Sequence, residues 1–567
     1  MSERDAKGTN NFWLISPWRR PVTVLLALAL AGLLASSGCV VGPDYHAPAT
    51  TMPVAYHETA TVPSAAADAI SRDLQAIATT QAVGPTTSIT RVAATAPTTA
   101  AALTPTTEQA AEQVPSNLSR WWEEFHDPEL NSLISRAINA NLSIASAESS
   151  VRQSRAVLIG ESAPFYPQVN VTGAYTRSHP PRVAKGNDLY QAGLDATWEL
   201  DVFGGEQRTI EQAGAQLGAA IENKRDVLIT VLGEVALDYV QLRGLQSQLA
   251  IAENSLKGQE NTLDLTESRF KAGLTGELDV ANARAVVDDS AATIPTLESQ
   301  IRQQIHALAV LLALEPGALS DELTMPQPLP VGPPIVPPGL PGELLRRRPD
   351  VRLAERQLAA ANAGIGAAQS DLYPKFTLNG SIDIQSNLPK GLANWRDHSY
   401  SIGPNIVWPL FDAGSIRANI RIQDELAEQA LNNYRSTVLS ALQNVEDALI
   451  IYNKEQVRRA ALTAAVRANQ RAFDLSNELY EKGLADFLSV LTDEQNLYSA
   501  QNQLAASETQ IAVDLVSLYK ALGGGWEETD TIPSATDKQD RFDTTGATDV
   551  PGTTDHDKQN SEAKSAN

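Results

Sequence analysis

Apolar residues recur three or four positions apart along a proline-free stretch that runs from Gly414 to Leu522. In its first part they are Leu431, Tyr434, Val438, Leu442, Val445, Leu449 and Tyr452. This spacing places one apolar stripe along a helix whose other faces are polar. Segment 482–487 interrupts the pattern and predicts a glycine turn between two helices, at about 414–482 and 486–522. At roughly 1.5 Å per residue the first helix would be about 100 Å long, so we expect it to lie against other long helices.

The same pattern occurs a second time in the chain. The offset from Gly273 to Gly483 is 210 residues, and the offset from Tyr166 to Tyr373 is 207 residues. The matching segments are 269–274 with 479–484, 198–204 with 408–414, and 165–167 with 372–374. Matched aromatic residues, prolines and glycines in one order predict an internal two-fold repeat. Two merely similar coiled-coil arms are the alternative.

Each copy is predicted to have the same order of elements. A helix (about 129–161 and 342–370) ends at a Tyr-Pro step, because the residue before proline is pushed out of the helical region. Two segments of alternating polarity follow it in each copy, at Gln168–Ser178, Leu189–Leu200, Lys375–Ser386 and Ser399–Trp408. Each has about the ten residues that a tilted strand needs to cross a membrane. Soluble hairpins alternate in the same way, but the position between long helical arms favours membrane strands.

The N-terminal segment is typical of a secretion signal. Arg19-Arg20 precede an apolar run from Val22 to Leu34, and the small residues 35–38 lead to Cys39. The segment resembles a bacterial lipoprotein signal, which predicts a signal peptide at 1–38 and lipidation at Cys39. An ordinary signal peptide or membrane anchor with an incidental cysteine is the alternative.

Composition narrows the function further. The chain of 567 residues has a net charge of −23 and no basic cluster suited to phosphates, so we expect no nucleic-acid partner. Cys39 is the only cysteine, which excludes an internal disulfide. Beyond the N-terminus no apolar run reaches the length of a membrane helix, so any crossing is expected to use strands in a closed barrel.

These features predict six regions. They are the signal peptide 1–38, a lipid anchor and disordered Ala/Thr/Pro-rich tether 39–118, the first repeat 119–324, a Pro-rich linker 325–341, the second repeat 342–526, and a disordered acidic tail 527–567. The low share of aromatic residues, 5%, suits long helices better than a large enzyme core.

The sequence offers no reactive centre. The seven histidines are scattered and form no His-x-x-x-His pair, which argues against a metal site. Gly364-Ile365-Gly366 lies inside a helical pattern that follows no strand, so it is not a dinucleotide loop. We therefore expect a protein that is not an enzyme and uses no cofactor and no metal.

The motifs resemble those of the TolC-like outer-membrane efflux proteins, in the NodT or OprM-like lipoprotein branch. The residues that carry the resemblance are 39–45 (CVVGPDY), Trp121-Trp122 with Phe125, 347–351 (RRPDV), 408–414 (WPLFDAG) and 519–526 (YKALGGGW). The resemblance implies an α+β membrane protein with a long antiparallel α-helical barrel and four transmembrane strands per chain. A homotrimer would complete a 12-stranded β-barrel in the outer membrane of a Gram-negative bacterium.

The resemblance also implies partners and sites. The duct would contact outer-membrane lipid and dock a periplasmic adaptor coupled to an inner-membrane pump of the resistance-nodulation-division type. The turn residues Gly273, Leu274, Gly483 and Leu484 would contact the adaptor. Leu488 matches the leucine of the family's gate. Thr492 stands where the family has the gate's Asp, which is a departure, and Asp493 follows it directly. The alternative for the turn residues is that they only cap helices. The alternative for the gate residues is that they only form a solvated helix face.

Two other functions share parts of this pattern. A type I protein-secretion duct would have the same architecture with a different cargo. A lipid-anchored coiled-coil scaffold would have no pore. The motif Val41-Gly42-Pro43-Asp44-Tyr45 favours the efflux branch over the secretion duct, and four symmetrically placed alternating segments argue against the scaffold.

Overall fold

The computed structural model describes residues 40–48, 52–53, 55–56, 118–179, 186–333, 336, 339, 341–393 and 395–527. The helices are α3 (Pro128–Ala140), α4 (Leu142–Ser162), α5 (Gly205–Lys271), α6 (Glu277–Leu311), α7 (Ser320–Leu323), α8 (Pro341–Arg347), α9 (Pro349–Ser370), α10 (Ser415–Glu481) and α11 (Phe487–Ala521). Short 3₁₀ helices are η2 (Leu118–Phe125), η3 (Ala163–Phe165), η4 (Pro389–Ala393) and η5 (Trp395–Asp397). The strands are β1 (Gln168–Ser178), β2 (Asn187–Leu200), β3 (Lys375–Ser386) and β4 (His398–Val407).

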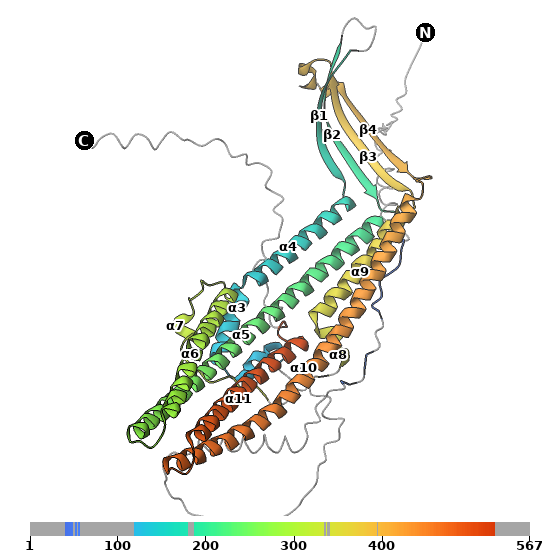
Figure 1. Ribbon diagram of the computed structural model, residues 1–567. Coiled ribbons are helices and arrows are strands. Elements are labelled where there is room, and N and C mark those ends of the chain that lie inside the picture. The colour runs from blue at the N-terminus through green and yellow to red at the C-terminus, as the bar shows by residue number, and fades with distance from the viewer. Residues whose placement is uncertain are drawn as a thin grey trace, which may run out of the picture.

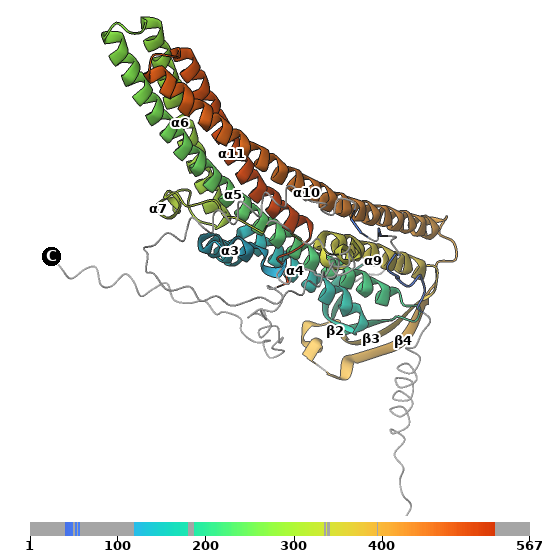
Figure 2. The ribbon, with the colours of Figure 1, turned by 90° about the horizontal axis from the view of Figure 1, so that it is seen from below.

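Each strand is continued by a helix that runs away from the sheet (Figure 1). Helix α4 leads to β1 and α9 leads to β3, whereas β2 leads into α5 and β4 into α10. The sheet order is β1-β2-β3-β4, and the helices pack in the same order, α4 on α5, α5 on α9 and α9 on α10. Farther from the sheet α6 packs on α5, and α11 packs on both α5 and α10. Two long helical hairpins therefore form the end of the molecule opposite the sheet (Figure 2).

The two copies of the repeat agree residue by residue within the sheet. Gln168 of β1 pairs with Thr197 of β2. Lys375 and Val407, their counterparts at offsets of 207 and 210, pair with each other in β3 and β4. The predicted repeat, both long helices, both return helices and all four strands are thus confirmed, with element ends shifted by one or two residues.

The first helix of each copy is broken, which the apolar pattern did not predict. In the first copy the break lies at Asn141, whose side chain caps α4 by accepting hydrogen bonds from the backbone N–H groups of Ser143 and Ile144. In the second copy it lies at Arg348, before Pro349. The prediction of single helices at 129–161 and 342–370 is therefore wrong, because an asparagine cap and a proline each start a new helix.

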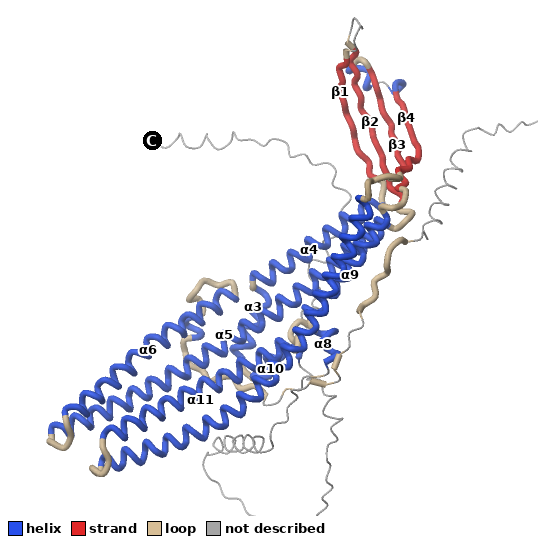
Figure 3. Tube along the Cα trace, turned by 45° about the vertical axis from the view of Figure 1, so that its right-hand side comes forward, coloured by secondary structure: helices blue, strands red, loops and turns tan. Residues whose placement is uncertain are grey.

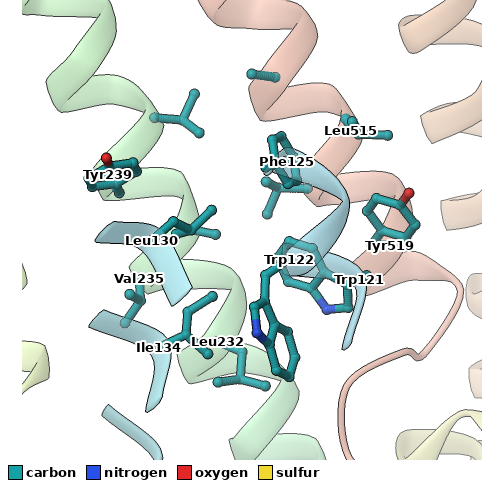
Figure 4. Close-up of a cluster of buried hydrophobic side chains, with 14 of the residues drawn as sticks. Trp121, Trp122, Phe125, Leu130, Ile134, Leu232, Val235, Tyr239, Leu515 and Tyr519 are labelled. Carbon is teal, nitrogen blue, oxygen red and sulfur yellow. The ribbon is translucent and has the colours of Figure 1, made fainter. Parts of the chain in front are cut away.

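The main core lies midway along the helices, where η2 and α3 pack against α5 and α11. Figure 4 shows Trp121 and Trp122 beside Leu232 of α5 and Tyr519 of α11. The Trp121 ring stacks on the Tyr519 ring with a centroid distance of 5.4 Å. Burial of such aromatic side chains fixes the short η2 segment to the long helices. None of the helices in the described part of the chain has both the length and the apolar character needed to span a membrane.

Candidate functional site

The two hairpin tips have the same geometry. Gly273 and Gly483 both adopt φ 73°, in the left-handed region that favours glycine. The next residue closes each turn: Leu274 N donates to Arg269 O at 2.9 Å, and Leu484 N donates to Leu479 O at 2.8 Å. Both leucine side chains are exposed. The tips lie side by side at the end farthest from the sheet, as Figure 3 shows, so they present two exposed leucines together.

A cation–π contact joins the two hairpins just above the tips. The Arg269 guanidinium of α5 lies 4.5 Å from the centroid of the Tyr480 ring of α10. Its Nη1 donates to the carbonyl oxygen of Glu481 at 3.3 Å. Tyr480 and Phe487 are buried together in a small apolar cluster. The sequence analysis missed Arg269, although the repeat could have revealed it, because the matching position in the second copy is Leu479.

The predicted gate residues lie on the first turns of α11. Leu488 is 62% exposed, and Thr492 is exposed one turn later on the same face. The Thr492 hydroxyl donates to the Leu488 carbonyl oxygen at 2.8 Å. Asp493 is half-buried, because one further residue rotates a side chain by about 100° around the helix. Leu488 and Thr492 therefore share an open face from which Asp493 turns away, and their role in gating stays a prediction.

Glu494 lies deeper still, between α11 and α5. It is 6% exposed, and a Cβ added to Gly258 of α5 would lie 3.5 Å from its Oε1 atom. Burial raises the pKa of this carboxyl from 4.5 to about 7. No ion pair or hydrogen bond of its side chain is found among the described residues. The joint between the two hairpins thus contains a titratable group that the sequence did not single out as buried.

The segment that follows Cys39 is bound to the body near the sheet. We call residues 40–48 the strap. The side chain of Arg208 in α5 is 5% exposed and donates three hydrogen bonds to the strap. Its Nε donates to Val41 O at 3.2 Å, and its Nη2 donates to Gly42 O at 3.2 Å and to Asp44 Oδ1 at 2.7 Å. The guanidinium also holds the pKa of the Asp44 carboxyl below its usual range.

The strap also packs closely on α9. A Cβ on Gly42 would overlap the Cα of Gly366, so the two backbones touch there. Asn362 Nδ2 donates to Pro43 O at 3.1 Å. Beyond the strap, Tyr56 is buried in the same core cluster as Leu118. Of the tether predicted for 39–118, the described residues 40–48, 52–53 and 55–56 instead lie against the helices or in the core.

Cys39 itself, the signal peptide and the tail beyond Glu527 lie outside the described residues. Val40, the neighbour of Cys39, contacts Gly204 at the junction of β2 and α5. Lipidation of Cys39 stays a prediction.

The strands carry alternating apolar side chains on one face. The exposed ones in the two outer strands are Val169, Val171 and Tyr175 in β1, and Tyr400, Ile402 and Ile406 in β4. They alternate with polar or small residues along both strands. This pattern suits a sheet with one face toward lipid.

The fold and these motifs can be compared with known proteins. The chain matches the family described as Outer membrane efflux protein over residues 133–314 and 340–524. This chain belongs to that family. The match covers both repeats, from α3 to the end of α11, and it places the protein in the outer membrane of a Gram-negative bacterium.

Individual relatives cover most of the chain. It is 33% identical over 432 residues to the pyoverdine export outer membrane protein OpmQ of Pseudomonas aeruginosa, spanning 73% of this chain and 88% of the relative. It is 32% identical over 413 residues to Nodulation protein T of Rhizobium leguminosarum bv. viciae, spanning 72% and 85%. The solved outer-membrane channel OprN is 31% identical, with a TM-score of 0.74, over 86% of this chain and 100% of that chain. The predicted TolC-like fold, with long helices joined to a strand domain, is thereby confirmed.

Proposed function

We propose that three copies of this chain form the outer-membrane exit duct of a tripartite efflux pump, which passes small molecules from an inner-membrane pump to the exterior. The observation that carries this proposal is the pair of open edges on the sheet. In the described sheet β1 and β4 each have a hydrogen-bonded neighbour on one side only. Unpaired strand edges are not tolerated in lipid, so further copies must close the barrel.

The two ends of the molecule would have different roles. The strand domain would cross the outer membrane, held there also by a lipid on Cys39, and the helices would extend the duct into the periplasm. The exposed Leu274 and Leu484 at the paired tips are suited to contact a periplasmic adaptor, which would couple the duct to a resistance-nodulation-division pump. Leu488 and Thr492 would narrow the aperture next to the tips.

Planar-bilayer conductance, combined with the mass of the purified protein in detergent, tests this function. We expect a trimer mass and discrete channel steps. Leu488→Ala should enlarge the steps if this side chain narrows the aperture, whereas Leu439→Ala, an exposed leucine far along α10, should leave them unchanged. A monomer mass without conductance would contradict the duct and favour the lipid-anchored scaffold.

The tips allow a matched test of adaptor docking. Gly273→Val and Gly483→Val should weaken crosslinking to the adaptor and efflux in cells, because a β-branched residue at φ 73° costs about 1–2 kcal/mol and distorts the turn. Gly276→Val is the control, since Gly276 has φ −89° and ψ 161°, where valine fits well. Wild-type crosslinking and efflux in both tip variants would refute the docking role.

A further inference from the structure

Helix α11 carries an ionisable residue within its buried face. Near the tip the buried residues recur three or four positions apart, at Phe487, Val490, Leu491, Glu494 and Leu497. Such spacing gives a helix one face for packing against its neighbours. Of these five residues only Glu494 can ionise. A carboxylate on a buried face is unfavourable unless it is paired or takes up a proton, so the protonation of this group and the packing of the helix are linked.

The polar groups of α5 beside Glu494 are engaged within α5. The Glu494 Oε1 atom lies over the backbone of Gly258, 3.5 Å from the position of a Cβ there. Gly258 lies inside α5, so its N–H donates within the helix, and its carbonyl also accepts from the Thr262 hydroxyl at 3.1 Å. The adjacent buried amide of Gln259 donates to Ser255 Oγ at 3.1 Å. These groups therefore leave the carboxyl of Glu494 without a hydrogen bond from α5.

No charged side chain on the described helices around Glu494 shifts its pKa. Burial alone raises the pKa of this carboxyl from 4.5 to about 7. The charged residues in the neighbouring turns are exposed or half-exposed. They are Glu253, Lys257, Glu260 and Asp264 in α5, Arg284 in α6, Arg467, Arg471, Asp474 and Glu478 in α10, and Asp493 in α11. The protonation of Glu494 therefore depends on the pH and on whether the packed helices cover it.

Glu494 lies at a level where few apolar contacts hold the two hairpins together. Toward the tips, the small apolar cluster that joins α6, α10 and α11 ends on α11 at Leu491. Away from the tips, the main core reaches α11 only at Ile511. The stretch 492–510 belongs to neither cluster. Separation of the hairpins at this level would therefore break less apolar packing than separation at either cluster.

The first hairpin has a different arrangement at the matching position. The counterpart of Glu494, at the offset of 210 residues, is Arg284 of α6. Its guanidinium forms an ion pair with Glu267 of α5 at 2.7 Å, and the Arg284 side chain is 62% exposed. A solvated ion pair contributes little to packing, and both of its groups stay charged near neutral pH. The buried carboxyl is therefore particular to the hairpin of α10 and α11, which also carries the predicted gate.

We propose that Glu494 is a proton-operated latch between the two hairpins. With a proton, the neutral carboxyl allows α11 to lie against α5 and keeps the two tips together. Without the proton, the carboxylate has to be hydrated, so α11 moves off α5, water enters along 492–510, and the tips separate. This inference rests on the proposed exit duct and adds a control of its periplasmic opening by pH.

The direction of the pH effect follows from the protons that each state binds. In the separated state the carboxyl is in water and has its ordinary pKa of 4.5, whereas in the joined state its pKa is about 7. The joined state thus binds more protons, and a rise in pH favours separation. The ratio of separated to joined hairpins should rise by up to about tenfold per pH unit within this window, and by roughly 50-fold from pH 5 to pH 7.5.

Planar-bilayer recordings of the full-length protein at pH 5 and pH 7.5 test the latch. In wild-type protein the ratio of open to closed time should be at least about tenfold higher at pH 7.5. Glu494→Gln, which keeps nearly the same shape without a charge, should show the pH 5 behaviour at both values. Glu260→Gln is the matched control, because Glu260 is an exposed glutamate of α5 two residues from Gly258. The control should respond to pH as the wild type does.

Spin labels on Lys271→Cys and Lys482→Cys report the movement of the hairpins independently of ion flow. Both lysines are exposed, and one lies beside each tip. The distance distribution of the doubly labelled protein, corrected with the two singly labelled proteins, should gain a longer component at pH 7.5. Addition of Glu494→Gln should remove this component, because the uncharged side chain keeps α11 on α5.

The possible outcomes separate the latch from the duct. A trimeric channel without a pH response, or with one that Glu494→Gln leaves unchanged or that Glu260→Gln removes equally, would overturn the latch and leave the duct intact. A pH response of the conductance without a change in the spin-label distances would overturn the latch in the same way. A monomer mass without conductance at either pH would refute the duct itself. A pH response and a longer distance that only Glu494→Gln removes would establish the latch.

Discussion

Replacement of Arg208 by methionine is expected to release the strap from the body. Methionine keeps much of the apolar packing against Gly366 but removes the donors to Val41 O, Gly42 O and Asp44. A hydrogen bond from a charged group to a carbonyl is worth about 1.5 kcal/mol or more, so the two carbonyl bonds alone correspond to about a 100-fold change in local opening. Chymotrypsin should therefore cleave after Tyr45 about 100-fold faster, as measured by mass spectrometry of the fragments.

Arg435→Met provides the control, because Arg435 is an exposed arginine on α10. It should leave the cleavage rate at Tyr45 unchanged. Equal cleavage of wild-type protein and Arg208→Met would mean that other contacts, such as those of Asn362 and Gly366, suffice to hold the strap.

Glu494→Gln is expected to stabilise the protein at alkaline pH and not at acidic pH. Burial raises the pKa of Glu494 from 4.5 to about 7. Proton binding by the folded protein therefore makes a contribution to stability that is fully present below the unfolded pKa of 4.5. This contribution is lost as the pH rises toward 7, and above 7 the buried charge costs about 3 kcal/mol. Glutamine has nearly the same shape and no charge, so the variant should unfold at a higher temperature at pH 8.

The comparison requires thermal unfolding of the assembled protein in detergent at pH 4.5 and pH 8. The difference between variant and wild type should be large at pH 8 and near zero at pH 4.5. Glu260→Gln, on the exposed face of α5, should show no such pH dependence. An equal difference at both pH values would show that Glu494 is not buried as an uncharged group.

Local signals in the sequence predict the long helices, the tips and the strands of this fold. The long helices follow from apolar spacing, and the tips follow from Gly483 and Gly273 interrupting it. The strands follow from two segments of alternating polarity in each copy, which lie between a Tyr-Pro step and a tryptophan motif. Such patterns depend on residues close together in the chain, where periodicity and turn chemistry act directly.

Apart from the helix breaks at Asn141 and Arg348, the features that the sequence did not predict depend on contacts between distant parts of the chain. Arg208 and Asp44 are 164 residues apart, and nothing near either residue indicates the other. In the sequence Glu494 resembles an exposed helical carboxylate, and only the packing of α5 over it makes it buried. Departures between the repeats could have pointed to Arg208 and Arg269, since their counterparts are the uncharged Ala418 and Leu479. The position of the predicted gate residues relative to a lumen depends on neighbouring chains and so requires the assembly.

Tyr56 and Leu118 are buried in one core cluster, so the 61 residues between them begin and end at that cluster. Both ends of this stretch are held in that core cluster, so its contour length does not set the distance between the strap and the body. Doubling the length of such a closed loop costs only about 0.6 kcal/mol in chain entropy. The length of this stretch can therefore change without moving the strap.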